Sequence, residues 1–167
     1  MSGNGGAVDG DRVTSNEERY SQGEDMNNTT APKWLTATAI LALIWNAIGC
    51  MAYLADVRMT PEEIAALPPV QQQLVAARPA WAVAATAVAV WAGLLGSLGL
   101  LLRRRWAFPV FVASLIGVLV QDYALFVVAR VTDVLGIVPL LLQALVLLIA
   151  VLLVMLARRG VAQGWLK

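Results

Sequence analysis

A few polar side chains stand inside stretches of the chain that are otherwise apolar. Asn46, Gln121 and Gln143 are amides, and Asp122 is a carboxylic acid next to one of them. In hydrocarbon such groups need hydrogen-bond partners, because lipid tails supply none. At 1.5 Å of rise per helical residue, the three amides fall within about two helical turns of the same depth. The four residues form a candidate polar cluster, which would serve either as interhelical hydrogen bonds or as the lining of a substrate or water cavity.

Asp122 has three candidate roles. Pairing with Arg130, Arg58 or Arg78 would offset the free-energy cost of an isolated carboxylate in hydrocarbon. A proton-coupling role would have Asp122 load and release a proton, although such relays usually use more than one titratable group. Lateral contact with another subunit is the third role.

Two tryptophans also stand far from the ends of the apolar stretches. Trp45 and Trp91 lie near the middle, whereas tryptophans of membrane proteins concentrate at the two interfaces. They either pack in the core or form an aromatic lining, on which a flat or sugar-like ligand would stack beside the amides.

Motifs for other chemistry are missing. The chain has no histidine and one cysteine, Cys50, so it offers no metal-ligand cluster and no Cys-His nucleophile pair. A phosphate-binding glycine loop, a nucleophile elbow and a pair of buried acids are absent as well. We therefore expect no catalysis, no cofactor and no metal, and without a nucleic-acid-reading fold we expect no nucleic-acid partner.

The elements that carry these residues are predicted to be membrane helices. With 59% hydrophobic and 14% charged residues, the chain has the composition of an integral membrane protein. Each apolar segment exceeds the roughly 20 residues that a membrane-spanning helix needs, and helices satisfy their own backbone in lipid. The predicted fold is all-α, an integral membrane four-helix bundle. Its spans are expected near residues 34–56, 80–102, 106–129 and 134–157.

The connection between the first two spans, residues 57–79, is too long for a simple turn. Thr60 to Glu63 predicts a helix start with proline in its first position and a capping box. Pro68 and Pro69 should end that helix, and a second short helix should follow before Pro79. The result is a short helical hairpin, which either caps the bundle or acts as a lid or partner-binding element.

Residues 1–32 differ from the rest of the chain. They are rich in Gly, Ser, Asn and acidic residues and lack the pattern of a secretory signal,. They are predicted to form a disordered, acidic, cytoplasmic tail. Residues 33–167 form the predicted transmembrane domain.

Basic residues beside the spans predict the orientation. Seven lie on one side of the predicted bundle and three, Arg58, Arg78 and Arg130, lie on the other. Positive charge favours the cytoplasmic side, so we expect a multi-pass protein of the cell inner membrane with both termini in the cytoplasm. The seven are Lys33, Arg103, Arg104, Arg105, Arg158, Arg159 and Lys167.

Small residues predict where helices pack, because close backbone approach drives helix association in lipid. Ala85, Ala89, Gly93 and Ser97 recur every four residues in the second span. Two other faces are expected to point inward, and Gly49 and Gly117 are their packing positions. These faces are Ala42, Asn46, Gly49 and Tyr53 in the first span, and Ser114, Gly117, Gln121 and Ala124 in the third.

Several strings of the sequence are similar to one known family. KWLTATAILALIWNAIGCMAYL, MTPEEIAALPPVQQ, RPAW and RRRWAFPVFVAS resemble a family of small bacterial four-helix membrane proteins that are often labelled "sugar transporter". The similarity spans about residues 33–167. Trp45, Asn46 and Gln121 fit the pattern of that family, whereas Asp122 departs from it.

Two hypotheses on function follow. The first is a non-catalytic accessory, structural or interaction subunit in the lipid bilayer, which packs through the second span as a homo-oligomer or beside a larger membrane complex. The alternative is an oligomeric small-molecule transporter, with sugar as one substrate class. Its path would run along Asn46, Gln121, Gln143, Trp45 and Trp91.

Overall fold

The computed structural model describes residues 31–167, so the predicted tail lies almost wholly outside the described residues. Within them, four helices are long and apolar enough to cross a membrane, and no strand occurs. The prediction of an all-α four-helix bundle is confirmed. The long helices are α2 (Lys33–Val57), α5 (Ala80–Leu101), α6 (Ala107–Tyr123), which continues into the π-helix η1 (Ala124–Val128), and α8 (Val138–Ala162).

The fourth span begins later than residue 134. A separate short helix, α7 (Val131–Leu135), precedes it. The backbone turns on both sides of α7, since Arg130 has φ 47° and Gly136 has φ 72°. Both angles lie in the left-handed region, which interrupts a right-handed helix and suits glycine. The third span therefore ends in η1, and the fourth runs from residue 138 to residue 162.

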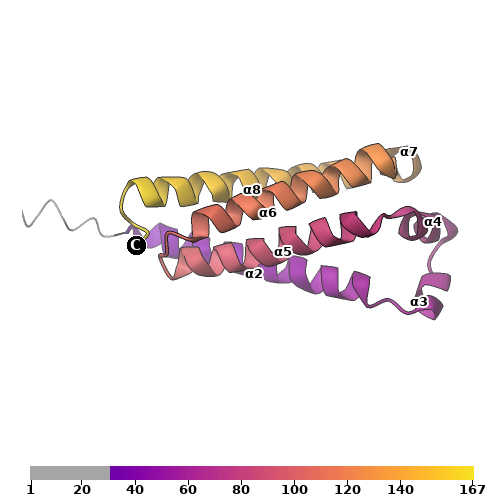
Figure 1. Ribbon diagram of the computed structural model, residues 1–167, viewed down its shortest axis with the longest axis horizontal. Helices are drawn as coiled ribbons and strands as arrows, with labels where there is room; N and C mark the ends of the chain where they lie inside the picture. Colours follow the sequence, from indigo (N-terminus) through magenta and orange to yellow (C-terminus); the bar gives the residue numbers. More distant parts are fainter. Residues whose placement is uncertain (1–30) are drawn as a thin grey trace, which may run out of the picture. The chain divides into compact units, whose positions relative to one another are not determined.

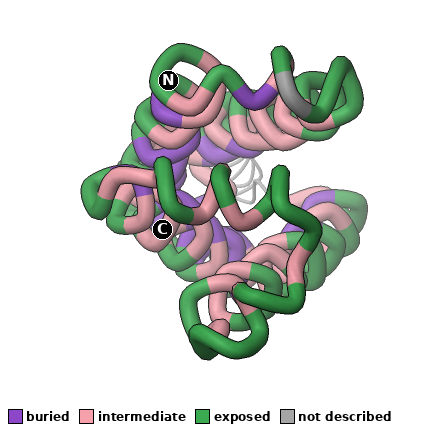
Figure 2. The backbone as a smooth tube through the Cα atoms, turned by 90° about the vertical axis from the view of Figure 1, so that its right-hand side faces the viewer, coloured by how far each residue is buried: buried purple, intermediate pink, exposed green. Residues whose placement is uncertain are grey.

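The long helices pack in chain order. α2 packs on α5, α5 on α6, and α6 on α8, so α2 and α8 are the two outer members of the series (Figure 1). Viewed along the bundle, exposed residues cover the outside and buried residues lie where helices meet (Figure 2). Most of the exposed residues on these helices are apolar, as expected where lipid rather than water surrounds the bundle.

Small residues bring α5 and α6 close together. A Cβ atom on Gly117 would lie 2.7 Å from the Ala89 backbone nitrogen, and a Cβ on Gly96 would lie 2.7 Å from the Phe111 ring. Phe111 is accordingly buried. Because lipid tails are as apolar as the side chains, this dense packing is what holds the helices together.

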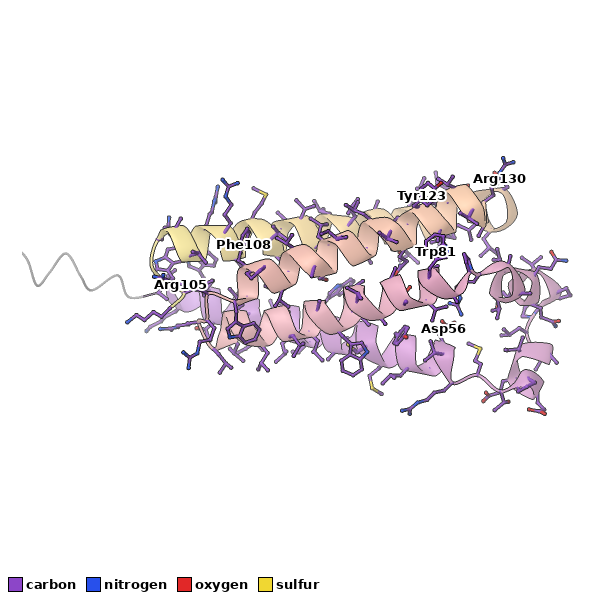
Figure 3. The ribbon with its side chains drawn as sticks, in the orientation of Figure 1. Asp56, Trp81, Arg105, Phe108, Tyr123 and Arg130 are labelled. Carbon is purple, nitrogen blue, oxygen red and sulfur yellow. The ribbon has the colours of Figure 1, made fainter. Side chains whose placement is uncertain are left out.

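The two ends of the bundle carry different elements. The loop end carries α3 (Pro61–Ala65) and α4 (Pro69–Ala77), and the arginine end carries Arg103–Arg105 and the C-terminus. Asp56, Trp81 and Arg130 lie toward the loop end and Arg105 lies at the arginine end (Figure 3).

The hairpin at the loop end has the predicted capping box. The Glu63 amide donates to Thr60 Oγ1 at 3.3 Å, and the Thr60 amide donates to Glu63 Oε2 at 2.7 Å. The second helix starts at Pro69, because proline suits the first turn of a helix as well as ending the one before it. An ion pair of 2.6 Å between Arg78 and Asp56 joins the end of the hairpin to the end of α2.

The last residues of the chain fold back onto the turn between α5 and α6. The Lys167 amide donates to the Arg103 carbonyl at 2.7 Å, and the Arg105 amide donates to the Lys167 carbonyl at 3.0 Å. Leu166 is fully buried, next to Gly160. Trp165 meets Trp34 edge to face, with ring centroids 5.8 Å apart. The start of α2 and the end of the chain therefore meet at the arginine end.

Candidate functional site

The interior of the bundle contains a cavity of about 380 Å³ to which all four long helices contribute. It runs from Phe111 and Leu153 at its deep end to Tyr53 and Asp56 toward the loop end. Its volume falls in the range of small-molecule pockets, roughly 300–1,000 Å³. This cavity is the candidate functional site.

Two regular stripes of side chains form the facing walls of the cavity. Residues spaced three or four apart lie on one face of a helix, and both α2 and α8 line the cavity with that spacing. The α2 stripe is Trp45, Ile48, Gly49, Ala52, Tyr53 and Asp56, and the α8 stripe is Gln143, Val146, Ile149, Ala150 and Leu153.

All three predicted amides line the cavity, but no hydrogen bond joins them to one another in the described part of the chain. Asn46 Nδ2 donates to the Ala42 carbonyl at 2.8 Å and to Ser97 Oγ at 3.0 Å. Gln143 Nε2 is buried without a partner. The amides thus share a cavity rather than a hydrogen-bonded layer.

Two serines also make hydrogen bonds in the middle of the bundle. The Ser97 hydroxyl donates to the Gly93 carbonyl at 2.9 Å, and the Ser114 hydroxyl donates to the Ala89 carbonyl at 2.6 Å. Both side chains are buried. Sequence reasoning placed both on inward faces by their spacing, but it missed these hydrogen bonds, because a serine hydroxyl inside a helix can bond its own helix or a neighbouring one.

Asp122 has no arginine partner in the described residues. Arg78 pairs with Asp56, and no ion pair in residues 31–167 involves Asp122, so the predicted pairing with arginine is wrong. Asp122 faces Gln143 on α8, yet Asp122 Oδ1 and Gln143 Nε2 fall short of a hydrogen bond and are buried unpaired. Asp122 is also absent from the cavity lining, so the predicted polar cluster keeps its amides and loses its acid. The acid lies two residues before η1, whose rare π geometry is frequent at functional sites.

The two mid-span tryptophans lie in different environments. Trp45 lines the cavity, in agreement with a role as an aromatic wall. Trp91 is 43% exposed and does not line it, so its assignment to an aromatic lining is wrong. The helix turns Trp91 outward because its neighbours Ala89 and Gly93 are the small residues that face the packed interior.

The small residues of α5 pack inside the chain. Asn46 Oδ1 occupies the place that a Cβ on Gly93 would need, and that Cβ would also lie 3.2 Å from Ser114 Oγ. A Cβ on Gly117 would lie 2.9 Å from the Ala85 carbonyl oxygen. Gly49 is different, since a Cβ there would meet only Val90 Cγ1 at 3.8 Å. Gly49 therefore borders the cavity rather than a close helix contact.

A smaller cavity of about 170 Å³ lies next to the main one toward the loop end. Thr86 and Gln121 line both cavities, whereas Asp56 lines the main one and Arg78 the smaller one. The Arg78–Asp56 ion pair thus spans the boundary between them.

The arginines used to predict orientation gather at one end. Arg103, Arg104 and Arg105 lie between α5 and α6, and Arg158 and Arg159 lie in the last turns of α8. In the described residues no group of three His, Cys, Asp or Glu side chains could hold a metal ion.

Comparison of the chain with protein-family models, curated proteins and solved structures gave no match.

Proposed function

We propose that this protein is a non-catalytic, multi-pass protein of the cell inner membrane that binds a small molecule in the cavity between its four spans, as a transporter or carrier does. The observation that carries the proposal is the cavity itself, of about 380 Å³ and lined from all four long helices. Pockets that bind small molecules combine apolar walls with a few polar groups. Here Trp45 and Leu153 supply apolar surface, and Gln121 and Gln143 supply hydrogen-bonding groups.

The packing of α5 favours this function over lateral assembly. The hypothesis of an accessory subunit depended on small residues that a neighbouring subunit could approach. Ala89, Gly93 and Ser97 are instead buried within the chain, where α2 and α6 contact them. The resemblance to four-helix proteins labelled "sugar transporter" agrees with a role in transport.

Filling the cavity tests the proposal. Gly49→Phe would place a ring in the cavity, since the position has open space around its Cβ. Met51→Phe is the matched control, because Met51 is 69% exposed and does not line the cavity. Both variants and the natural chain would be extracted directly into lipid nanodiscs and analysed for retained small molecules by native mass spectrometry.

We expect a retained molecule in the natural chain and in Met51→Phe, and its loss in Gly49→Phe. Equal retention in Gly49→Phe, with an unchanged melting temperature, would exclude the cavity as the binding site. Absence of any retained molecule from all three would count against the proposed function.

An accessory or interaction subunit remains the second candidate, and α8 is the feature that favours it. The most apolar stretch of 18 residues in α8 has the highest mean hydropathy of the four spans, 3.1, and the smallest buried share, 11%. A laterally packed copy or larger complex would cover that surface. Mass measurement in nanodiscs tests the second candidate. Assembly through α8 predicts a complex larger than one chain, which Leu148→Asn together with Leu152→Asn should disrupt. A monomeric natural chain would contradict the second candidate.

A further inference from the structure

The main cavity is open along one side. Trp45, Ile48 and Ala52 line it and are nevertheless exposed, Trp45 by 41% and Ile48 by 61% of the residue's surface. α2 packs on α5, and α8 packs on α6 and α7, so the two stripes that form the facing walls belong to helices that do not pack closely on each other. Both helices have the length and composition of membrane spans. The opening between them therefore faces the hydrocarbon of the bilayer.

At the arginine end a separate pocket of about 280 Å³, lined by Trp34, Arg159 and Trp165 among others, shares no lining residue with the main cavity. Trp34 and Trp165 bring the start of α2 against the end of the chain, and Leu166 is buried beside Gly160. The main cavity stops before this region, at the buried side chains of Phe111 and Leu153.

Hydrogen-bonding capacity is distributed unevenly along the cavity. Toward its middle, both protons of the Asn46 amide nitrogen and the proton of the Ser114 hydroxyl are already donated to other groups of the protein. Closer to the loop end, Gln143 faces Asp122 but its Nε2 makes no hydrogen bond, and neither Gln121 nor Tyr53 bonds through its side chain to the described part of the chain. Free hydrogen-bond donors among the lining amide and hydroxyl side chains therefore lie only near Tyr53, Gln121 and Gln143, whereas Asn46 Oδ1, Thr86 Oγ1 and Ser114 Oγ can still accept.

The cavity also has no free charge to offer. Asp56 is the charged residue among its lining side chains, and Arg78 neutralises it at 2.6 Å. A charged ligand group would lose its hydration in this site without gaining an opposite charge.

We infer that the ligand is a neutral amphiphile dissolved in the membrane, which enters sideways between α2 and α8. Its apolar part lies among Trp45, Phe111, Ile149 and Leu153, and its single hydrogen-bonding head lies near Tyr53, Gln121 and Gln143. This inference rests on the proposed function and names its ligand class. A free sugar fits less well, because its hydroxyl groups at the end formed by Phe111, Ile149 and Leu153 would face apolar walls without partners,.

Photolabelling in nanodiscs with the full chain tests the ligand class. One probe is a monoacylglycerol with a diazirine in its acyl chain, and the other is a diazirine derivative of glucose. Only labelling that excess unlabelled monoacylglycerol or glucose suppresses is counted, because an acyl probe also labels lipid-facing positions. We expect the acyl probe to label peptides containing the α2 and α8 stripes, suppressed by monoacylglycerol and not by glucose.

Variants connect the labelling to the site. Gly49→Phe should abolish the suppressible labelling, and Gln121→Leu with Gln143→Leu should weaken monoacylglycerol competition about tenfold, since two hydrogen bonds are lost. Gln71→Leu with Gln73→Leu on the exposed face of α4 is the matched control and should change nothing.

Suppressible labelling by the glucose probe alone, abolished by Gly49→Phe, would overturn the amphiphile and leave the proposed function intact. If neither probe gives suppressible labelling, the amphiphile is excluded, and the retention experiment with Gly49→Phe decides the proposed function separately.

Discussion

Single residues on α5 and α6 set how closely the helices approach. Three glycines have different surroundings. Gly117 leaves room for a neighbouring backbone, Gly93 leaves room for the side-chain amide of Asn46, and Gly49 borders a cavity. The effect of adding one methyl group should therefore differ in sign between positions. Replacing a helical glycine by alanine favours the helix by up to about 1 kcal/mol, whereas overpacking costs about 1–3 kcal/mol.

Gly117→Ala is predicted to destabilise the bundle. Its methyl would lie 2.7 Å from the Ala89 nitrogen and 2.9 Å from the Ala85 carbonyl, and backbone atoms cannot move aside alone. We expect a loss of about 1–3 kcal/mol, measured by thermal or denaturant unfolding in mild detergent. Gly49→Ala is the matched control and should be neutral or stabilising, because its methyl meets only Val90 at 3.8 Å. Equal stability of both variants would contradict this account.

Gly93 and Asn46 should be coupled. Gly93→Ala would displace the Asn46 side chain and break its 3.0 Å hydrogen bond to Ser97, a bond worth about 0.6 kcal/mol between membrane helices. In an Asn46→Ala background the same substitution should cost clearly less, since the obstructing amide is gone. A double-mutant cycle of unfolding free energies measures the coupling. Additive effects would mean that the two residues act independently.

At the scale of elements, helix positions were easier to predict from the sequence than helix rotation. Length and hydropathy identified the four spans, and the capping box identified α3. Small residues at spacings of three and four identified the inward faces that carry Gly93 and Ser114. The same spacing places Trp91, two residues from Ala89 and from Gly93, on the opposite face of α5,, so the interpretation of Trp91 as an aromatic lining overlooked a signal that the sequence contains. Which side chain lies opposite Asp122 depends on how α6 and α8 are turned about their axes, and the sequence pattern does not specify this.

The C-terminal segment is an element that composition did not reveal. Leu166 is fully buried although it follows the last turn of α8, and two backbone hydrogen bonds hold Lys167 to Arg103 and Arg105. Residues 163–167, the five that follow α8, contain only two large apolar side chains, too few for composition to predict a packed segment. Only the folded contacts show that they join α8 to the turn between α5 and α6.

Leu166→Ala is predicted to loosen the arginine end. Truncating a buried leucine costs about 2 kcal/mol or more, so the melting temperature in mild detergent should fall and carboxypeptidase should remove the last residues faster. Lys167→Ala is the control, because the side chain of Lys167 is exposed and its hydrogen bonds come from the backbone. If both variants behave alike, the burial of Leu166 contributes little to the stability of this end.

At the scale of the whole molecule, the two ends differ in the sign of their charged residues. In the described residues every acid lies toward the loop end or within the loop-end half, namely Asp56, Glu62, Glu63, Asp122 and Asp133, whereas the arginine end is basic throughout. The positive-inside tendency therefore predicts a cytoplasmic arginine end. The same prediction places the α3–α4 hairpin and the loop-end side of the cavity on the outer side of the membrane.

Cysteine labelling tests that orientation. Cys50 is buried and should react slowly, so single cysteines can be introduced at Gln71 in the hairpin and at Gln163 near the arginine end, both exposed. A membrane-impermeant maleimide should label Gln71→Cys in intact cells, and it should label Gln163→Cys only after permeabilisation. The reverse pattern would place the hairpin in the cytoplasm. Labelling of both sites in intact cells would indicate that the chain inserts in both orientations. Replacing Arg103–Arg105 by alanine should shift the natural chain toward such mixed insertion, because these three charges provide much of the charge asymmetry between the two ends.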